Sequence, residues 1–245
     1  MISNVVILGC GRSGTSIFGE LFEALAYRYF FEPSMDQVRQ IDFRAGPVAM
    51  KVPKASSGSP VTPGLPFCLE DLMSVVPEPR TIFWSVRHPL DAVCSLRPGI
   101  EANWSHNPKP ADWQAWLERP LIERCARHWS YINFFGYGAV KDIAEVIRYE
   151  DLVSAPLQAA ERCCSAVGLI VSPERRATID RWALSVGNRK APACYEAKHQ
   201  VVWSRQDHSV RVGRWKENLS PEEVARVWKI VGPAAEPFRY DLPAT

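Results

Sequence analysis

The chain has 245 residues, of which 29 are basic and 27 acidic, and its formal net charge is +2. A chain of this length can bury a sizeable core in one domain, which we expect to span residues 1–245. The near-neutral charge excludes the global positive field that is typical of nucleic-acid and membrane-surface binders. Any anion-binding site must therefore be local.

The seven cysteines are odd in number and include no C-x-x-C pair, which indicates neither a disulfide framework nor a zinc site. We therefore expect free, mostly buried thiols in a reducing compartment, and no metal site. The N-terminal apolar run, residues 5–8, is interrupted by Gly9 and Gly11 before a signal peptide or membrane span could form. These features predict a cytoplasmic protein without a membrane span.

Residues 4–8 form a short apolar run that ends in glycines, as expected for a buried strand entering a tight turn. From Thr15 onward, apolar residues recur at helical spacing on one face. Between the two lies GCGRSGTS, which has the spacing of a phosphate-binding P-loop but carries Thr15 where the lysine belongs. Backbone N–H groups and the helix N-terminus could still hold an anion, with Arg12 adding positive charge. The alternative is a tight connection without a ligand.

Further strands are expected at residues 29–31, 48–50, 81–86 and 144–147, with helices at 67–76, 90–96 and 121–132. Strands that alternate with helices predict an α/β fold, a single three-layer domain with a mainly parallel sheet and a P-loop-like strand–loop–helix. Ligands should bind at the carboxyl ends of the strands. Two segments, 97–120 and 187–210, break the pattern and are expected to be long irregular loops.

The loop at 97–120 contains three tryptophans, Trp104, Trp113 and Trp116, and also His106. Indole rings suit a sugar, a phenol or an acyl chain about equally, because stacking on indole is chemically permissive. We therefore expect this loop to contact an acceptor molecule.

Three other stretches contain residues that could bind an anion. Arg87 follows a predicted strand and Ser95 lies eight residues later in a predicted helix, so both could face one bound anion. The stretch IRYEDL places Tyr149 where another strand ends. Residues 210–223 form a basic, glycine-bearing loop followed by a helix cap at Ser220. Taken singly, each could be capping or surface charge.

Together the four stretches resemble the sulfotransferases that use 3′-phosphoadenosine 5′-phosphosulfate (PAPS). In that family a P-[KR]-S-G-T-[TS] loop binds the 5′-phosphosulfate and R-x-P-x-x-x-x-x-S binds the 3′-phosphate. Y-E-D-L lies near the adenine, and a late R-x-G-x-x-x-W-K-N-like segment closes over the nucleotide. The resemblance implies that PAPS is bound by the matching residues of this chain. These are Gly11, Arg12, Ser13, Gly14, Thr15, Ser16, Arg87, Ser95, Tyr149, Arg211, Gly213, Arg214, Trp215 and Lys216.

The R-S-G-T-S loop is more similar to carbohydrate and tyrosylprotein sulfotransferases than to the cytosolic small-molecule enzymes. Those relatives are largely Golgi membrane proteins, whereas no membrane anchor is expected here, so we expect a soluble bacterial-type member. The resemblance implies in-line transfer of the sulfuryl group to a hydroxyl on a small molecule or carbohydrate, without nucleic acid. We expect Arg12 and Lys51 to stabilise developing charge and Glu32 to act as general base, its pKa raised by apolar neighbours.

Two departures from the family pattern are clear. The last motif is compressed at residues 214–218, and the chain lacks the K-T-H triplet that supplies the cytosolic enzymes' histidine base. Two other functions stay open from the residues alone. A P-loop kinase-like phosphotransferase would require the loop lysine and a magnesium-binding carboxylate, whereas a non-catalytic nucleotide-binding protein would keep the loop alone.

Overall fold

The computed structural model describes residues 2–187 and 210–242. Within them lies a sheet of five parallel strands in the order β2-β3-β1-β4-β5. The strands are β1 (Asn4–Gly9), β2 (Arg28–Phe31), β3 (Val48–Lys51), β4 (Arg80–Val86) and β5 (Ala144–Arg148). The prediction of an α/β fold with a parallel sheet is thus confirmed. The segment expected to form a loop at 187–210 lies, for residues 188–209, outside the described residues.

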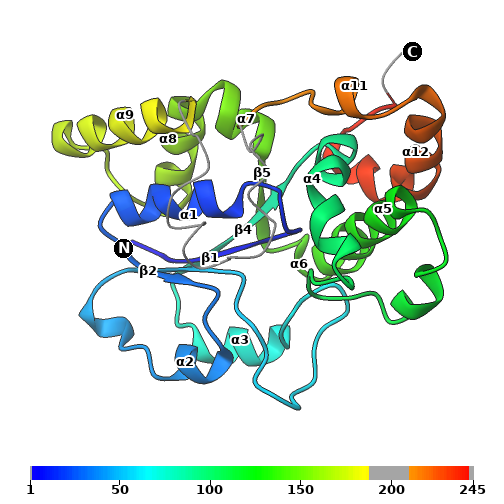
Figure 1. Cartoon of the computed structure of the whole chain (residues 1–245). Helices are drawn as coiled ribbons and strands as arrows, with labels where there is room; N and C mark the ends of the chain where they lie inside the picture. The colour runs from blue at the N-terminus through cyan, green and yellow to red at the C-terminus, as the bar shows by residue number, and fades with distance from the viewer. Residues whose placement is uncertain (1, 188–209, 243–245) are drawn as a thin grey trace.

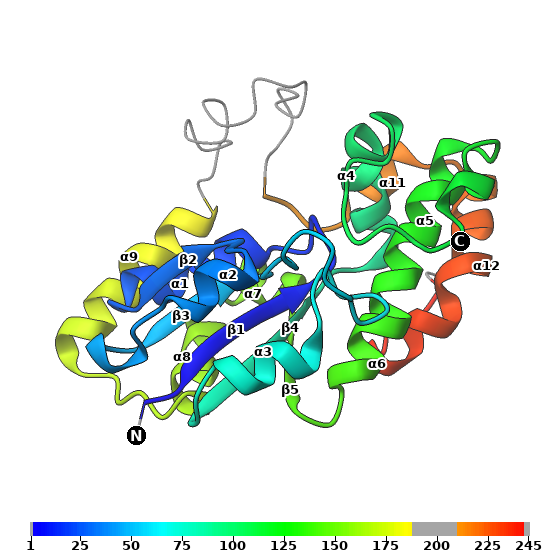
Figure 2. The same ribbon diagram turned by 90° about the horizontal axis from the view of Figure 1, so that it is seen from below.

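Helices cover both faces of this sheet (Figure 1 and Figure 2). One face carries α1 (Thr15–Ala24), α7 (Tyr149–Ser154), α8 (Pro156–Ala166) and α9 (Pro173–Gly187). The other core cluster takes side chains from α2 (Met35–Arg39), α3 (Leu69–Val75), α4 (Pro89–Glu101), α5 (Leu121–Tyr131), α6 (Tyr137–Val140) and α12 (Pro221–Ala235). Short helical turns complete the described chain: η1 (Phe43–Ala45), η2 (Trp113–Trp116), η3 (Ile132–Gly136), α11 (Trp215–Asn218) and η4 (Glu236–Phe238).

The alternation of side chains along β1 divides the core in two. Val5 and Ile7 point into the cluster under α1, whereas Val6 and Leu8 point into the cluster on the opposite face. All four are essentially buried, as expected of a central strand in a parallel sheet that is covered on both sides. The helical face predicted after Thr15 is also buried.

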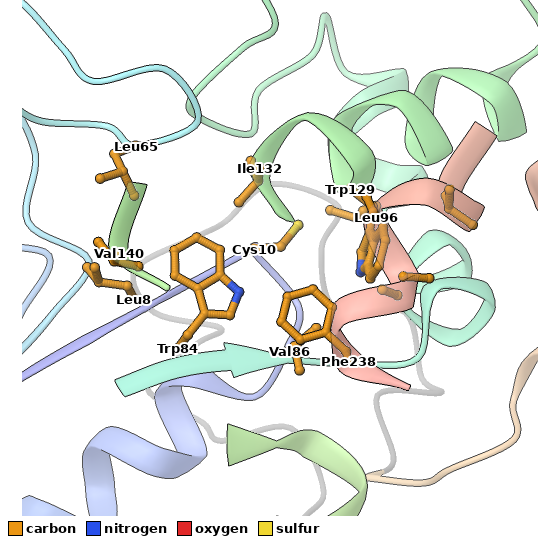
Figure 3. Close-up of a cluster of buried hydrophobic side chains, with 14 of the residues drawn as sticks. Leu8, Cys10, Leu65, Trp84, Val86, Leu96, Trp129, Ile132, Val140 and Phe238 are labelled. Atoms are coloured by element: carbon orange, nitrogen blue, oxygen red, sulfur yellow. The ribbon is translucent and has the colours of Figure 1, made fainter. Parts of the chain in front are cut away.

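The second cluster is built around Trp84 of β4 (Figure 3). The Trp84 indole donates a hydrogen bond to Asn133 Oδ1 (3.0 Å), and Asn133 Nδ2 donates to the Trp129 carbonyl (2.9 Å). Asn133 lies in η3, a π-helical turn that continues α5. The π turn therefore gives the buried indole a polar partner, which an interior Trp requires.

The segment 97–120 is more ordered than expected. Helix α4 continues past Leu96 to Glu101, with Pro98 inside it. Trp104 is fully buried, its indole donates to His128, and its ring meets Trp113 edge to face at 6.3 Å. The expectation that Trp104 contacts an acceptor is therefore wrong, because the ring belongs to the core. Trp113 and Trp116 are partly buried and pack against that core.

The strand order changes direction at the centre of the sheet. From β1 the chain builds β2 and β3 on one side, whereas β4 and β5 lie on the other side of β1. Ligands of open parallel sheets bind where the direction of building changes, at the carboxyl ends of the strands. The loops that follow β1 and β4 meet at this position.

The described cysteines are free, and Cys10, Cys125, Cys163 and Cys164 are buried, as expected. No helix in the described portion is long and apolar enough to cross a membrane. Among residues 2–187 and 210–242, no three His, Cys, Asp or Glu side chains are grouped to hold a metal ion.

Candidate functional site

The loop between β1 and α1 has a tightly curled backbone. A Cβ on Gly9, which has a φ of 140°, would lie 2.1 Å from the Ser85 carbonyl oxygen, so glycine is needed where β1 approaches β4. Arg12 and Gly14 both have left-handed backbones, with φ of 69° and 84°. The Ser85 hydroxyl donates to the Ser13 carbonyl (2.7 Å) and holds the loop on β4. Such curled backbone at the start of a helix is a typical anion-binding concavity.

Two arginines and one hydroxyl meet at this loop. Arg12 Nε donates to Ser95 Oγ at 3.1 Å, and Arg87 Nη1 donates to the Arg12 carbonyl at 3.3 Å. Arg87 and Ser95 are both nearly buried, at 5% and 6% exposure. The structure therefore brings together residues from the first two motifs, although Ser95 contacts Arg12.

Tyr149 of the third motif closes one wall of the site. The Arg87 guanidinium carbon lies 4.1 Å from the centre of its ring, within cation–π range. A Cβ on Gly14 would lie 2.7 Å from Tyr149 Cδ2, so the glycine allows the ring to pack against the loop. Burial raises the pKa of the Tyr149 phenol, which keeps it neutral.

The hydroxyls of the loop differ in their surroundings. Thr15 is buried, at 5% exposure, whereas Ser16 Oγ accepts a hydrogen bond from Lys51 Nζ (3.1 Å). Ser13 Oγ and Arg87 Nε are buried polar atoms with no hydrogen-bond partner within the described ranges. Buried polar atoms of this kind are normally satisfied, so an external anion suits this position.

Asp91, which sequence reasoning missed, holds the fourth motif in place. Its carboxylate accepts hydrogen bonds from the backbone N–H groups of Gly213 (2.7 Å) and Trp215 (3.0 Å). Arg87 Nη2 donates to the Arg211 carbonyl (3.1 Å) and lies 3.8 Å from Asp91 Oδ2. The compressed loop is therefore anchored on the start of α4. Asp91 follows Arg87 by four residues, but an acid in a first helical turn is usually explained by the helix dipole.

The rest of the fourth motif packs beside His88. The Trp215 ring stacks on the His88 imidazole with centroids 6.3 Å apart. Arg214 precedes α11, and its carbonyl accepts a hydrogen bond from Asn218 Nδ2 (2.7 Å). Lys216 is exposed, with Nζ 5.9 Å from the Trp215 ring. All four predicted motifs are thus adjacent, although Lys216 lies at their outer rim.

Glu150 connects the third motif to the C-terminal part of the chain. Its carboxylate accepts hydrogen bonds from the His88 backbone N–H (2.9 Å) and from the Tyr240 hydroxyl (2.6 Å). Burial lowers the pKa of His88, which also packs against the Tyr240 ring. The acid of Y-E-D-L therefore has a structural role that the motif alone did not indicate.

Glu32 and Lys51 form an ion pair beside the loop, with Lys51 Nζ 3.0 Å from Glu32 Oε1. Lys54 Nζ lies 2.6 Å from Glu32 Oε2. Burial alone would raise the pKa of Glu32, but the two ammonium groups outweigh it and hold the pKa below its ordinary value. The expectation of a raised pKa is therefore wrong, because it considered apolar neighbours and not the lysines.

Removing Asp91 tests how the fourth motif is anchored. The Asp91→Ala variant should lose about 2–4 kcal/mol of unfolding free energy, because two backbone N–H groups lose their acceptor. Amide hydrogen exchange at Gly213 and Trp215 should accelerate. Glu217→Ala is the control, since Glu217 is exposed and pairs with Arg211 at the surface. Unchanged exchange in Asp91→Ala would contradict this anchoring role.

Comparison with known proteins identifies the fold. No family model and no curated protein matches the sequence. Mouse sulfotransferase SULT7A1 complexed with PAP superposes with a TM-score of 0.62 at 16% identity, covering 95% of this chain and 84% of that chain. Retinol dehydratase in complex with retinol and PAP gives 0.59 at 13% identity, with coverages of 98% and 83%. The sulfotransferase domain from the curacin biosynthetic pathway gives 0.55 at 16% identity, covering 99% of both chains. The chain therefore has the fold of sulfotransferases, as its motifs predicted.

Proposed function

We propose that residues 1–245 form a single sulfotransferase domain, which transfers the sulfuryl group of PAPS to a hydroxyl on a small molecule or carbohydrate. The observation that carries this proposal is the convergence of Arg12, Arg87 and Tyr149 on a phosphate loop without lysine. The fold supports it, since two of the similar structures are sulfotransferase SULT7A1 and retinol dehydratase with PAP bound. The free thiols favour a reducing, cytoplasmic setting.

The residues present fit this nucleotide. When bound, PAPS supplies an activated sulfuryl group at its 5′-phosphate. The loop from Gly11 to Ser16 would hold the 5′-phosphosulfate, and the buried Ser13 hydroxyl offers it a hydrogen bond. Arg87 and Ser95 would hold the 3′-phosphate, with Tyr149 near the base. The fourth motif, anchored on Asp91, would cover the nucleotide.

Two cations of the chain are placed to stabilise charge that develops in transfer. Arg12 lies in the loop, and Lys51 Nζ reaches the same loop at Ser16. Burial lowers the pKa of Lys51, and the Glu32 carboxylate opposes this effect. Preorganised donors of this kind act mainly on the transition state. Glu32 therefore helps to keep Lys51 charged and in position.

Calorimetry with two nucleotides tests the proposed function. Adenosine 3′,5′-bisphosphate (PAP) should bind in the presence of a metal chelator, and Mg-ATP should bind weakly, because the lysine that reaches β- and γ-phosphates is absent. Tight binding of Mg-ATP with no binding of PAP would favour the kinase alternative. PAPS binding without transfer to any sugar, phenol or alcohol would favour the non-catalytic alternative.

The proposal that Arg87 binds the 3′-phosphate is tested by comparing two ligands, with and without that phosphate, in wild-type protein and in an Arg87 variant. Wild-type protein should bind PAP at least tenfold more tightly than adenosine 5′-phosphate, since a charge-assisted hydrogen bond contributes about 1.5–3 kcal/mol. In Arg87→Ala the preference should largely disappear. Arg97→Ala is the matched control, because Arg97 pairs with Glu223 outside the loop. An unchanged preference in Arg87→Ala would remove it from the 3′-phosphate site.

A further inference from the structure

His106 lies directly on the phosphate loop. After α4 ends, the chain reverses through Asn103 and Trp104, whose φ angles are 53° and 50°. Both the backbone N–H and the hydroxyl of Ser105 donate to the Gly99 carbonyl, at 2.8 and 2.9 Å. The reversal returns His106 to the loop, where a Cβ added to Gly11 would lie 3.4 Å from His106 Nδ1.

The backbone of this reversal is strained. A left-handed backbone is uncommon outside glycine and is an outlier for a residue as bulky as Trp104. Strained residues of this kind persist only where the surrounding structure holds them, and they cluster at functional sites. Here the strain has a visible result, since it places an imidazole beside the loop that carries Arg12.

Charged groups from two other parts of the site face the imidazole. Arg12 from the loop and Glu32 from the end of β2 both act on its charge. Burial, followed by the Arg12 cation, lowers the pKa of His106 to about 4. His106 is therefore neutral at pH 7, and one of its ring nitrogens can accept a proton.

The neighbouring histidine is fixed in one protonation state. The His128 ring lies 5.6 Å from the His106 ring, and its Nδ1 accepts a hydrogen bond from the Trp104 indole (3.1 Å). Because an indole N–H can only donate, the proton of neutral His128 is on Nε2. His128 is fully buried, and burial holds its pKa well below the ordinary value. His106 thus has a buried, neutral ring beside it.

We propose that His106 is the general base of the transfer reaction, in the role first assigned to Glu32; this inference rests on the proposed function. As the acceptor oxygen bonds to sulfur, an imidazole nitrogen of His106 takes the hydroxyl proton. The bond between sulfur and the 5′-phosphate oxygen breaks, and its electron pair remains on that oxygen. The imidazolium then releases its proton to water.

Glu32 is less suited to this role because of its ion pairs. Protonation of its carboxylate would break the contacts with Lys51 and Lys54 together. A protonated His106 instead becomes more favourable once anionic nucleotide lies against Arg12, because the added negative charge offsets that cation. The same bound anion therefore prepares His106 to receive a proton.

NMR of histidine-labelled protein tests this role without requiring turnover. The pKa of His106 should rise by about 1–3 units when saturating PAPS, or PAP with inorganic sulfate, is added to wild-type protein. An unchanged pKa in protein that demonstrably binds PAP would overturn the proposal. Failure of wild-type protein to bind PAP at all would instead count against the proposed function. The two outcomes therefore distinguish failure of the general-base proposal from failure of the proposed function.

Variants at two positions compare the candidate bases. His106→Gln should lower PAP release from PAPS by about 10²–10⁴-fold, with PAP affinity nearly unchanged. Glu32→Gln should keep a pH profile set by one titrating imidazole, shifted to somewhat lower pH because the carboxylate that raises the pKa of His106 is removed. His106→Ala should be rescued in part by free imidazole. Loss of the pH profile in Glu32→Gln, with wild-type rates in His106→Gln, would overturn the assignment.

Discussion

Arg12→Ala is expected to lower the rate of sulfuryl transfer by about 10²–10³-fold, equivalent to about 2.7–4 kcal/mol of transition-state stabilisation. Arg12 lies inside the loop with its guanidinium 3.1 Å from Ser95, where it can reach charge on a group held by the loop. Single-turnover kinetics with PAPS would measure the loss in kcat. PAP affinity should fall much less, since PAP lacks the transferred group.

Two other arginine variants help to interpret this result. Arg12→Lys keeps a positive charge but loses the planar pair of donors, so it should have an intermediate rate. Arg97→Ala removes an arginine that pairs with Glu223, and should transfer at the wild-type rate. If Arg12→Ala lowers affinity and rate equally, Arg12 binds the ground state and has no special role in transfer.

Acid is expected to begin to destabilise the fold near pH 6.5, above the ordinary pKa of carboxylates. Burial lowers the pKa of both His106 and His128, so the unfolded chain takes up these protons before the folded chain does. The stability that these two histidines contribute is fully present above pH 6.5. It is lost as the pH falls toward about 4, the pKa of His106. Because His106 is partly exposed, its share is at most about 3 kcal/mol. Urea unfolding at pH 7 and pH 4.5 would measure it.

A double variant isolates this effect. His106→Gln with His128→Gln removes both titrating rings, and the glutamine at 128 can still accept the Trp104 indole hydrogen bond. Its stability should change much less between the two pH values than that of the wild type. Glu32 does not interfere in this range, because its lowered pKa means that its contribution is lost only below its ordinary value of 4.5. Equal losses in both proteins would contradict the histidine origin.

The sheet was predictable because local pattern and burial agree. Apolar, β-branched runs such as the one at Val5 and Val6 mark strands that are covered on both faces. The glycine-rich loop also predicts tightly turned backbone, and Gly9 and Gly14 both have positive φ. The pattern did not predict that α4 continues through Pro98. Proline removes one backbone hydrogen bond from the helix, which costs less here than ending a well-packed helix.

The candidate site was predictable where its residues share a motif, and less so elsewhere. Arg12 and Arg87 each follow a strand, and those strands are neighbours in the sheet. Strand order alone therefore brings the two residues into contact. The partners of Glu32 could not be predicted, because Lys54 reaches it from beyond β3. Likewise, His106 reaches the loop through a strained reversal that no periodicity indicates.

The site draws on the ends of all the strands in the sheet, with Arg12 after β1, Glu32 after β2, Lys51 ending β3, Arg87 after β4 and Tyr149 after β5. No part of the chain smaller than the whole sheet can form it. Nucleotide binding would therefore stabilise the complete fold, by about 2.7 kcal/mol when the ligand is present at one hundred times its dissociation constant. Melting temperature thus becomes a way to rank candidate donors before any acceptor is known.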